Sequence, residues 1–170
     1  AGEALGPRRH YLSLKDLSVA EDLPQLLDAG VTSFKIEGRL KDATYVANVV
    51  SYFRSRLDAA LAARGMARSS SGTSTAGFVP DPVKTFNRGY TRYFLGGRLK
   101  GIGALDTPKM VGEPVGRVAR VQGRRITLEH AADLHPGDGV SYFDKRGTLC
   151  GVQVNMVDGA VFTAARDTAL

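Results

Sequence analysis

The chain has 170 residues, of which 43% are hydrophobic, and it carries a formal net charge of +6. It contains no run of about 18 apolar residues, which excludes a helical membrane span. The one cysteine, Cys150, excludes a disulfide framework and a metal site made of cysteines alone, and it is expected to be a small core residue. A single cysteine and the lack of a signal-peptide pattern fit a cytoplasmic protein.

The amino-terminal part predicts alternating strands and helices. A short strand is expected at residues 11–15, and Asp16 is the predicted N-cap of the helical segment that follows. Pro24 interrupts this segment and begins a second piece of helix, which Gly30 ends in the left-handed conformation that is common there. A second strand is expected at residues 31–37.

The second strand carries charged residues on one face. Alternation places Ser33, Lys35 and Glu37 on one side of it, with Phe34 and Ile36 on the other. Burying an unpaired Lys or Glu costs roughly several kcal/mol, so the two must pair with each other or face water. We therefore predict either an active-site wall, in which Lys35 binds an anion and Glu37 accepts a proton, or a structural salt bridge.

A long amphipathic helix follows at residues 43–63. Its apolar residues recur every three or four positions, Asp42 is its predicted N-cap, and Gly65 ends it. In the loop before it, Arg39 suits a carboxylate or phosphate, and Lys41 lies near the positive amino end of the helix, which indicates an anionic partner. The alternative for both side chains is simple solvent exposure.

The middle of the chain is basic. Residues 67–80 are rich in Ser, Thr and Gly and predict a flexible linker after a first domain at residues 1–66. Residues 81–110 are a basic, aromatic connecting segment. Residues 79–130 carry ten Lys and Arg against four Asp and Glu, an excess equal to the whole net charge. Such an excess indicates either a phosphate-binding surface or a solvated face.

Arginines and aromatic residues alternate inside the connecting segment. Arg88 and Arg92 are predicted to bind phosphates while neighbouring rings stack on bases. In the alternative, Phe86, Tyr90 and Phe94 form the apolar stripe of a short helix or turn.

Residues 111–170 predict a small antiparallel β-barrel. Short β-like runs are separated at regular spacing by turns rich in Gly, Pro and Asp. The runs are residues 115–121, 125–129, 139–143, 149–156 and 160–164.

The predicted fold class is α/β plus β. Two β/α units cannot close a sheet, and a (β/α)8 barrel needs roughly 200 residues or more. We therefore expect the carboxyl-terminal portion of a longer protein, with the last β/α units of a (β/α)8-like barrel followed by the small β-barrel domain.

Three motifs resemble one protein family. They are similar to motifs of the bacterial collagenase-like peptidases of unassigned catalytic type, family U32, and the resemblance covers about residues 8–100. It implies a (β/α)8-like catalytic domain and, by the family label, hydrolysis of peptide bonds. The motifs are Tyr-Leu-Ser-Leu-Lys-Asp-Leu at 11–17, Ser-Phe-Lys-Ile-Glu-Gly-Arg at 33–39 and Phe-Asn-Arg-Gly-Tyr-Thr at 86–91.

The resemblance also implies an alternative function. Several related proteins support C5-hydroxylation of a pyrimidine in transfer or ribosomal RNA, and these are thought to hold an iron–sulfur cluster on upstream cysteines. The single Cys150 cannot bind such a cluster, so a cluster would belong to the full-length parent. A further alternative is a non-catalytic module that binds RNA or protein. No metal and no membrane partner are predicted for this chain, and the oligomeric state stays open.

We assign Lys35 and Glu37 to catalysis on an RNA or protein substrate. A Ser–Lys nucleophile would need Ser13 and Lys15 to converge, whereas neighbours on one strand face point in parallel. Both are therefore placed with the substrate-binding residues, and the isolated chain is predicted to be inactive. The predicted substrate-binding residues are Ser13, Lys15, Arg39, Lys41, Arg88 and Arg92.

Overall fold

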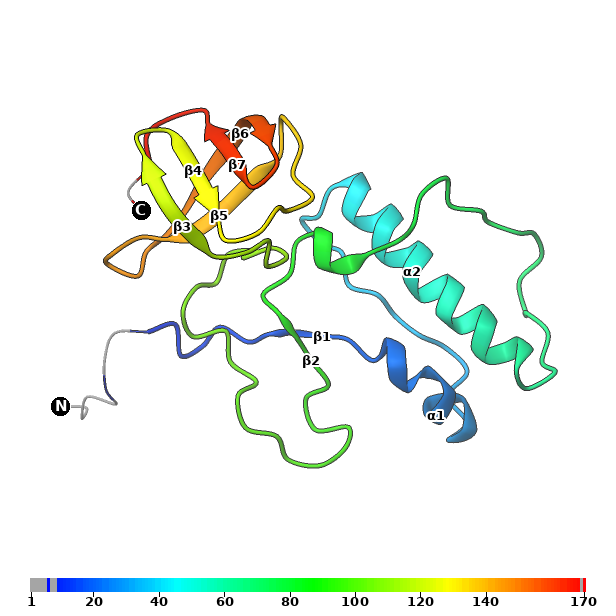
Figure 1. Ribbon diagram of the computed structural model, residues 1–170. Helices are drawn as coiled ribbons and strands as arrows, with labels where there is room; N and C mark the ends of the chain where they lie inside the picture. Colours follow the sequence, from blue (N-terminus) through cyan, green and yellow to red (C-terminus); the bar gives the residue numbers. More distant parts are fainter. Residues whose placement is uncertain (1–5, 7–8, 169) are drawn as a thin grey trace. The chain divides into compact units, whose positions relative to one another are not determined.

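A computed structural model describes residues 6, 9–168 and 170 (Figure 1). The chain divides into two compact units. Unit 2 is Lys15–Gly103, and unit 1 combines the described residues up to Leu14 with Ala104–Leu170. Unit 2 contains the helices, and unit 1 contains a five-stranded antiparallel sheet, so the chain is a mixed α and β protein.

The helices of unit 2 lie where the sequence predicts them. The 3-10 turn η1 (Ala20–Asp22) leads into α1 (Leu23–Asp28), whose first turn contains Pro24. Gly30 follows with a φ of 87°, as a glycine at a helix carboxyl end allows. The long helix α2 (Ala43–Ala62) begins at Asp42, whose carboxylate accepts a hydrogen bond of 2.7 Å from the Tyr45 backbone N–H.

The first predicted strand is displaced. Strand β1 is Asp16–Leu17 rather than residues 11–15, and it pairs in parallel with β2 (Tyr90–Thr91). Asp16 is therefore a strand residue and not a helix cap, because its carboxylate is bound to Arg88. The predicted aromatic helix or turn at Phe86–Phe94 is also wrong, since Tyr90 lies in β2 and Phe94 is 57% exposed.

The second predicted strand is wrong as well. Residues 31–37 form no strand, although the same segment is rich in β-formers. A strand exists only where its backbone groups pair with a neighbour, and the described residues contain no strand paired with this segment. Ile36 is correspondingly 39% exposed.

An irregular segment joins α2 to the 3-10 turn η2 (Pro82–Lys84). It contains residues 67–80, which Figure 1 draws as the loop that leads from the end of α2 back to η2. Arg68 donates to both oxygens of Asp58 on α2 and to the Gly72 carbonyl. At its far end, the buried Asn48 side chain accepts from the Asp81 N–H at 2.7 Å and donates to the Asp81 carbonyl at 2.6 Å.

The five predicted strands of unit 1 are confirmed, with ends shifted by a few residues. They form a curled antiparallel sheet in the order β3-β4-β7-β6-β5, yellow-green to red in Figure 1. Within the described residues β3 and β5 remain edges, so the sheet is a half-barrel and the predicted closed barrel is not formed. The strands are β3 (Val118–Gln122), β4 (Arg125–Leu128), β5 (Gly139–Phe143), β6 (Leu149–Asp158) and β7 (Val161–Ala164).

The sheet packs its core on one face. Ile126 and Ala164 are fully buried, and Val154 is 1% exposed. Alternation along each strand sends these residues to one side and leaves the other side exposed to solvent. The remaining members of this core are Leu128, Leu134, Val152 and Phe162. Among the described residues no helix is both long and apolar enough to cross a membrane.

Candidate functional site

Unit 2 contains a pocket of about 430 Å³ that includes both predicted catalytic residues. Its wall is largely apolar, with side chains from α1, α2 and the loop at residues 34–36. The polar groups that line it come from four separate stretches of sequence. They are Asp16, Ser18, Lys35, Glu37, Tyr45, Arg54 and Tyr90.

Short contacts position the β2 side of the pocket. Asn87 is 6% exposed, and its amide donates to the carbonyls of Val83 and Thr85 while its oxygen accepts from the Gly89 N–H. The Tyr90 hydroxyl donates to the Pro82 carbonyl at 3.0 Å. Because Asn48 on α2 holds the adjacent residue 81 through two hydrogen bonds, the helix and the β2 strand are fixed to each other.

Asp16 is the acceptor at the centre of this arrangement. Its carboxylate accepts from the Arg88 backbone N–H at 2.8 Å and from the Arg88 guanidinium at 2.6 Å. The bond to Asp16 raises the pKa of the Arg88 guanidinium, although burial opposes it. Arg88 is thus held by a carboxylate of its own unit, and its phosphate-binding role stays a prediction.

Two tyrosines of the pocket are held in their protonated form. Burial, with smaller contributions from Tyr45, Asp16, Asp81 and Tyr52, raises the pKa of Tyr90 to about 12. Burial and then the Asp16 charge also raise the pKa of Tyr45. At neutral pH both phenols are therefore hydrogen-bond donors, and neither is an accessible base.

The Tyr90 phenol gives a testable pH dependence. An acid whose pKa is higher in the folded state, here about 12 against 10.0, stabilises the fold below pH 10. This contribution is lost as pH rises from 10 through 12. Tyrosinate absorbance is titrated for the wild type and for Tyr90→Phe. The two curves should differ by one group that ionises near pH 12. Tyr90 is 37% exposed, so its phenol is only partly buried, and a difference near pH 10 would contradict even this partial burial.

Lys35 and Glu37 lie together at the rim. The Lys35 Nζ is 2.9 Å from the Glu37 Oε1, and the two side chains are 85% and 74% exposed. The hydrogen bond to Glu37 raises the pKa of Lys35, so this amine stays charged and does not act as a base at neutral pH. The pair offers one cation and one carboxylate to a polar ligand. Its catalytic role remains a prediction.

The other predicted binding residues are dispersed. Arg39 is exposed in its loop, whereas the Lys41 Nζ lies 3.1 Å from the centre of the Phe86 ring in a cation–π contact. Arg92 binds both oxygens of Asp22, which is 3% exposed. The binding roles of Arg39, Lys41 and Arg92 stay predictions.

Ser13 and Lys15 belong to different units, Ser13 to unit 1 and Lys15 to unit 2. Ser13 is buried, and its hydroxyl has no hydrogen-bond partner among the described residues. The Lys15 stem packs against Gly89, and its carbonyl accepts from the Tyr93 hydroxyl at 3.1 Å.

Sequence reasoning gave no site role to three polar residues of this region, namely Asp16, Asp22 and Tyr45, and it considered Tyr90 only as a stacking ring or as part of an apolar stripe. Asp16 and Tyr90 lie within motifs already singled out, at 11–17 and 86–91. The Arg88 and Arg92 partners lie 72 and 70 positions away along the chain. Such pairings depend on the tertiary fold and cannot be read from local spacing.

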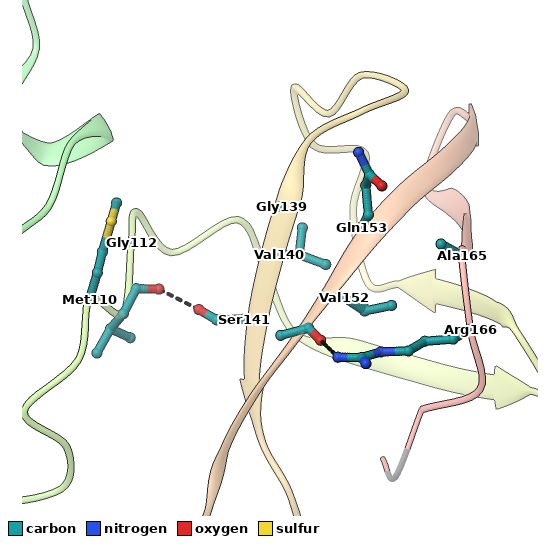
Figure 2. A pocket seen from close by; sticks show the side chains of 11 residues that line it. Met110, Gly112, Gly139, Val140, Ser141, Val152, Gln153, Ala165 and Arg166 are labelled. Carbon is teal, nitrogen blue, oxygen red and sulfur yellow. Dashed lines mark hydrogen bonds between the residues drawn. The ribbon is translucent and has the colours of Figure 1, made fainter. Parts of the chain in front are cut away.

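Unit 1 has a second, open hollow of about 710 Å³ along β5 and β6 (Figure 2). Figure 2 shows Met110 and Gly112 on one side and Arg166 on the other. The Ser141 hydroxyl donates to the Val111 carbonyl at 2.5 Å, and Arg166 donates to the Gly151 carbonyl at 2.6 Å. Both polar side chains are thus engaged with backbone.

The described residues do not fit an iron–sulfur cluster. No three His, Cys, Asp or Glu side chains converge among them. Such clusters are held by several cysteine thiolates, and Cys150 alone supplies one.

Comparison with known proteins points to one family. The model described as Peptidase family U32 matches residues 2–103. The "23S rRNA 5-hydroxycytidine C2501 synthase" of Escherichia coli is 43% identical over 158 residues, which are 92% of this chain and 24% of that protein. No solved structure matches the chain.

Two further relatives carry different names. The "tRNA hydroxylation protein P1" of Bacillus subtilis is 48% identical over 48 residues, which are 28% of this chain and 11% of that protein. A "Collagenase" of Porphyromonas gingivalis is 29% identical over 158 residues, which are 88% of this chain and 36% of that protein. The chain thus spans between about a quarter and two fifths of the relatives that it matches along most of its length.

Proposed function

The chain belongs to peptidase family U32, and on this premise we propose that it is part of a protein that supports C5-hydroxylation of a pyrimidine in ribosomal or transfer RNA. The observation that carries the proposal is the 43% identity to the rRNA synthase along 92% of the chain. The identity to the collagenase along 88% of the chain is 29%. The RNA alternative is therefore better supported than the peptidase reading that the family label suggests.

The proposal includes an architecture. Unit 2 would complete a (β/α)8-like barrel with other residues of a longer protein, located in the cytoplasm. The parallel pairing of β1 with β2 and the strand–helix order of unit 2 support this. In such a barrel the Lys35–Glu37 pair would stand at the rim of the active site, where ligand loops lie. Reaction chemistry that needs a cluster would be supplied by residues outside this chain.

Peptide hydrolysis is the second candidate function, favoured by the family label and the collagenase relative. The predicted serine gives it little support. Hydrolysis by a side-chain nucleophile needs an activating base in hydrogen-bond reach. The Ser13 hydroxyl has no such partner among the described residues.

Complementation tests the RNA proposal directly. The complete protein that contains this chain is expressed in Escherichia coli lacking the C2501 synthase, and nucleosides of 23S rRNA are measured by mass spectrometry. We expect 5-hydroxycytidine to return. Hydroxycytidine that stays absent, together with gelatin cleavage by the purified protein, would favour the peptidase reading.

A further inference from the structure

Unit 1 carries a group of arginines that no carboxylate neutralises. Between residues 117 and 128 the chain has four arginines and no acidic residue. All four are exposed, and none has a side-chain hydrogen bond or ion pair with another described residue. We name this group the hairpin arginines, and its members are Arg117, Arg120, Arg124 and Arg125.

Most arginines of unit 2 differ from the hairpin arginines, because each is paired with a carboxylate. Arg64 binds Asp28 and Arg68 binds Asp58. The two arginines that the sequence predicted to bind phosphate are likewise paired, Arg88 with Asp16 and Arg92 with Asp22. Unpaired cations also occur elsewhere among the described residues, such as Arg39 and Arg98 in unit 2, but the β3–β4 hairpin gathers four unpaired arginines within nine residues.

Strand register places the hairpin arginines on the solvent side of the sheet. Val121 lies opposite Ile126, which is fully buried in the core. The neighbouring pairs must point the other way, because successive side chains alternate between the two faces. Arg120, opposite Thr127, and Arg125, opposite Gln122, therefore share the outer face.

The turn and the strand start extend this basic surface. Gly123 and Arg124 form the two-residue loop between β3 and β4, and Gly123 has a φ of 58° that suits glycine at the first loop position. Arg124 thus stands at the hairpin tip. Its backbone is fixed, because its carbonyl accepts from the Ala164 N–H at 2.8 Å. Arg117 directly precedes β3, and its carbonyl accepts from the Glu129 N–H at 2.9 Å.

We propose that this outer face of the β3–β4 hairpin binds the phosphate backbone of the RNA substrate, an inference that rests on the proposed function. Guanidinium groups match phosphate oxygens in planar, two-pronged hydrogen bonds. Four such groups held on a paired hairpin present a fixed row of positive charge to a polyanion. Unneutralised like charges repel one another, and a bound polyanion relieves that repulsion.

The same face predicts how the RNA is contacted. Gln122 lies opposite Arg125 across β3 and β4, and the same cross-strand row continues over β7 and β6 with Thr163 and Met156. This row contains no aromatic ring. The aromatic residue of β7, Phe162, is buried in the core. Binding to unpaired bases usually relies on exposed aromatic stacking platforms. The hairpin arginines therefore bind backbone, and sequence is read elsewhere in the protein.

Salt-dependent RNA binding tests the proposal. The 170-residue chain is titrated with a fluorescent RNA hairpin at several salt concentrations, as wild type and as Arg120→Gln/Arg125→Gln. Each lost phosphate contact changes the log–log slope by about 0.7 to 0.9. We expect the double variant to flatten the slope by about 1.5 units and to weaken binding at low salt by about tenfold or more. Circular dichroism confirms that the variant is folded.

The matched control removes the same charge elsewhere on the same sheet. Lys145→Gln/Arg146→Gln changes two exposed residues in the turn between β5 and β6. This control should leave the slope unchanged. Equal losses in both variants would mean a general charge effect and would overturn the proposed surface, as would a wild-type chain that does not bind RNA. Binding of an acidic protein with no binding of RNA would also overturn it.

The two proposals fail separately. Hydroxylation is scored in cells by 5-hydroxycytidine, and binding is scored in vitro by the slope. If Arg120→Gln/Arg125→Gln restores hydroxycytidine as well as the wild type does and leaves the slope unchanged, the proposed function stands and the proposed RNA surface is wrong. A slope that flattens as expected without any hydroxycytidine retains the surface and loses the hydroxylation proposal.

Discussion

Arg92→Ala is expected to lower the free energy of unfolding by about 2–4 kcal/mol, since it leaves a buried carboxylate unpaired. Asp22 is 3% exposed, and Arg92 binds both of its oxygens. Because the Arg92 side chain is itself 49% exposed, the loss should fall below that of a fully buried pair. Urea unfolding, followed by circular dichroism, measures it.

Two further variants test whether the loss comes from the unpaired buried charge. Asp22→Asn placed in the Arg92→Ala background removes the unpaired charge and should recover part of the lost stability. Arg56→Ala breaks an exposed pair with Glu21, at 3.1 Å, and should cost less than about 1 kcal/mol. If Arg92→Ala costs no more than Arg56→Ala, the buried pair does not stabilise unit 2.

Glu37→Gln is expected to reduce RNA hydroxylation by the complete protein at least about tenfold, within the range that positioned acid–base groups contribute. It should change the free energy of unfolding by less than about 1 kcal/mol, because the Lys35–Glu37 pair is exposed. The measurements are 5-hydroxycytidine yield in the complementing strain and the unfolding midpoint of the purified protein.

Lys35→Gln separates the two roles of this pair. If Lys35 binds an anion, this substitution should weaken substrate binding. If the pair is only a structural salt bridge, both substitutions should have equally mild effects on activity and equal costs in stability. Glu21→Gln is the control, because Glu21 is an exposed carboxylate paired to an arginine away from the pocket wall. Loss of activity in that control would argue against a specific role for Glu37.

Local patterns predicted the elements that depend on local interactions. The helix at 43–63, its Asp42 cap and the five strands of unit 1 follow from apolar periodicity, capping and turn residues, which act within a few positions. The Lys35–Glu37 pair also depends on two residues that are close in sequence. The helix, its cap and the Lys35–Glu37 pair need only residues a few positions apart, and most strands of unit 1 pair with the strand next to them in sequence.

Features that need a distant partner could not be predicted. Residues 31–37 have a strand-like composition, but no described strand pairs with them. The ion pairs of Arg88 with Asp16 and of Arg92 with Asp22 also join residues that are far apart in the sequence. In the sequence, the hairpin arginines are part of a broad basic segment. The fold distinguishes them, because they have no carboxylate partner among the described residues and the register of β3 and β4 places Arg120 and Arg125 on one face.

The open edges of the five-stranded sheet have a consequence for self-association. An unpaired edge is a template on which a strand from another molecule can add. On β3 the register shifts between Val118 and Arg120, and both the irregularity and the arginine charge discourage such addition. β5 has a regular register with β6 from Gly139 to Phe143 and no charged residue of its own. Intermolecular strand addition at high concentration should therefore begin at β5, and Ser141→Lys would be the first substitution to suppress it.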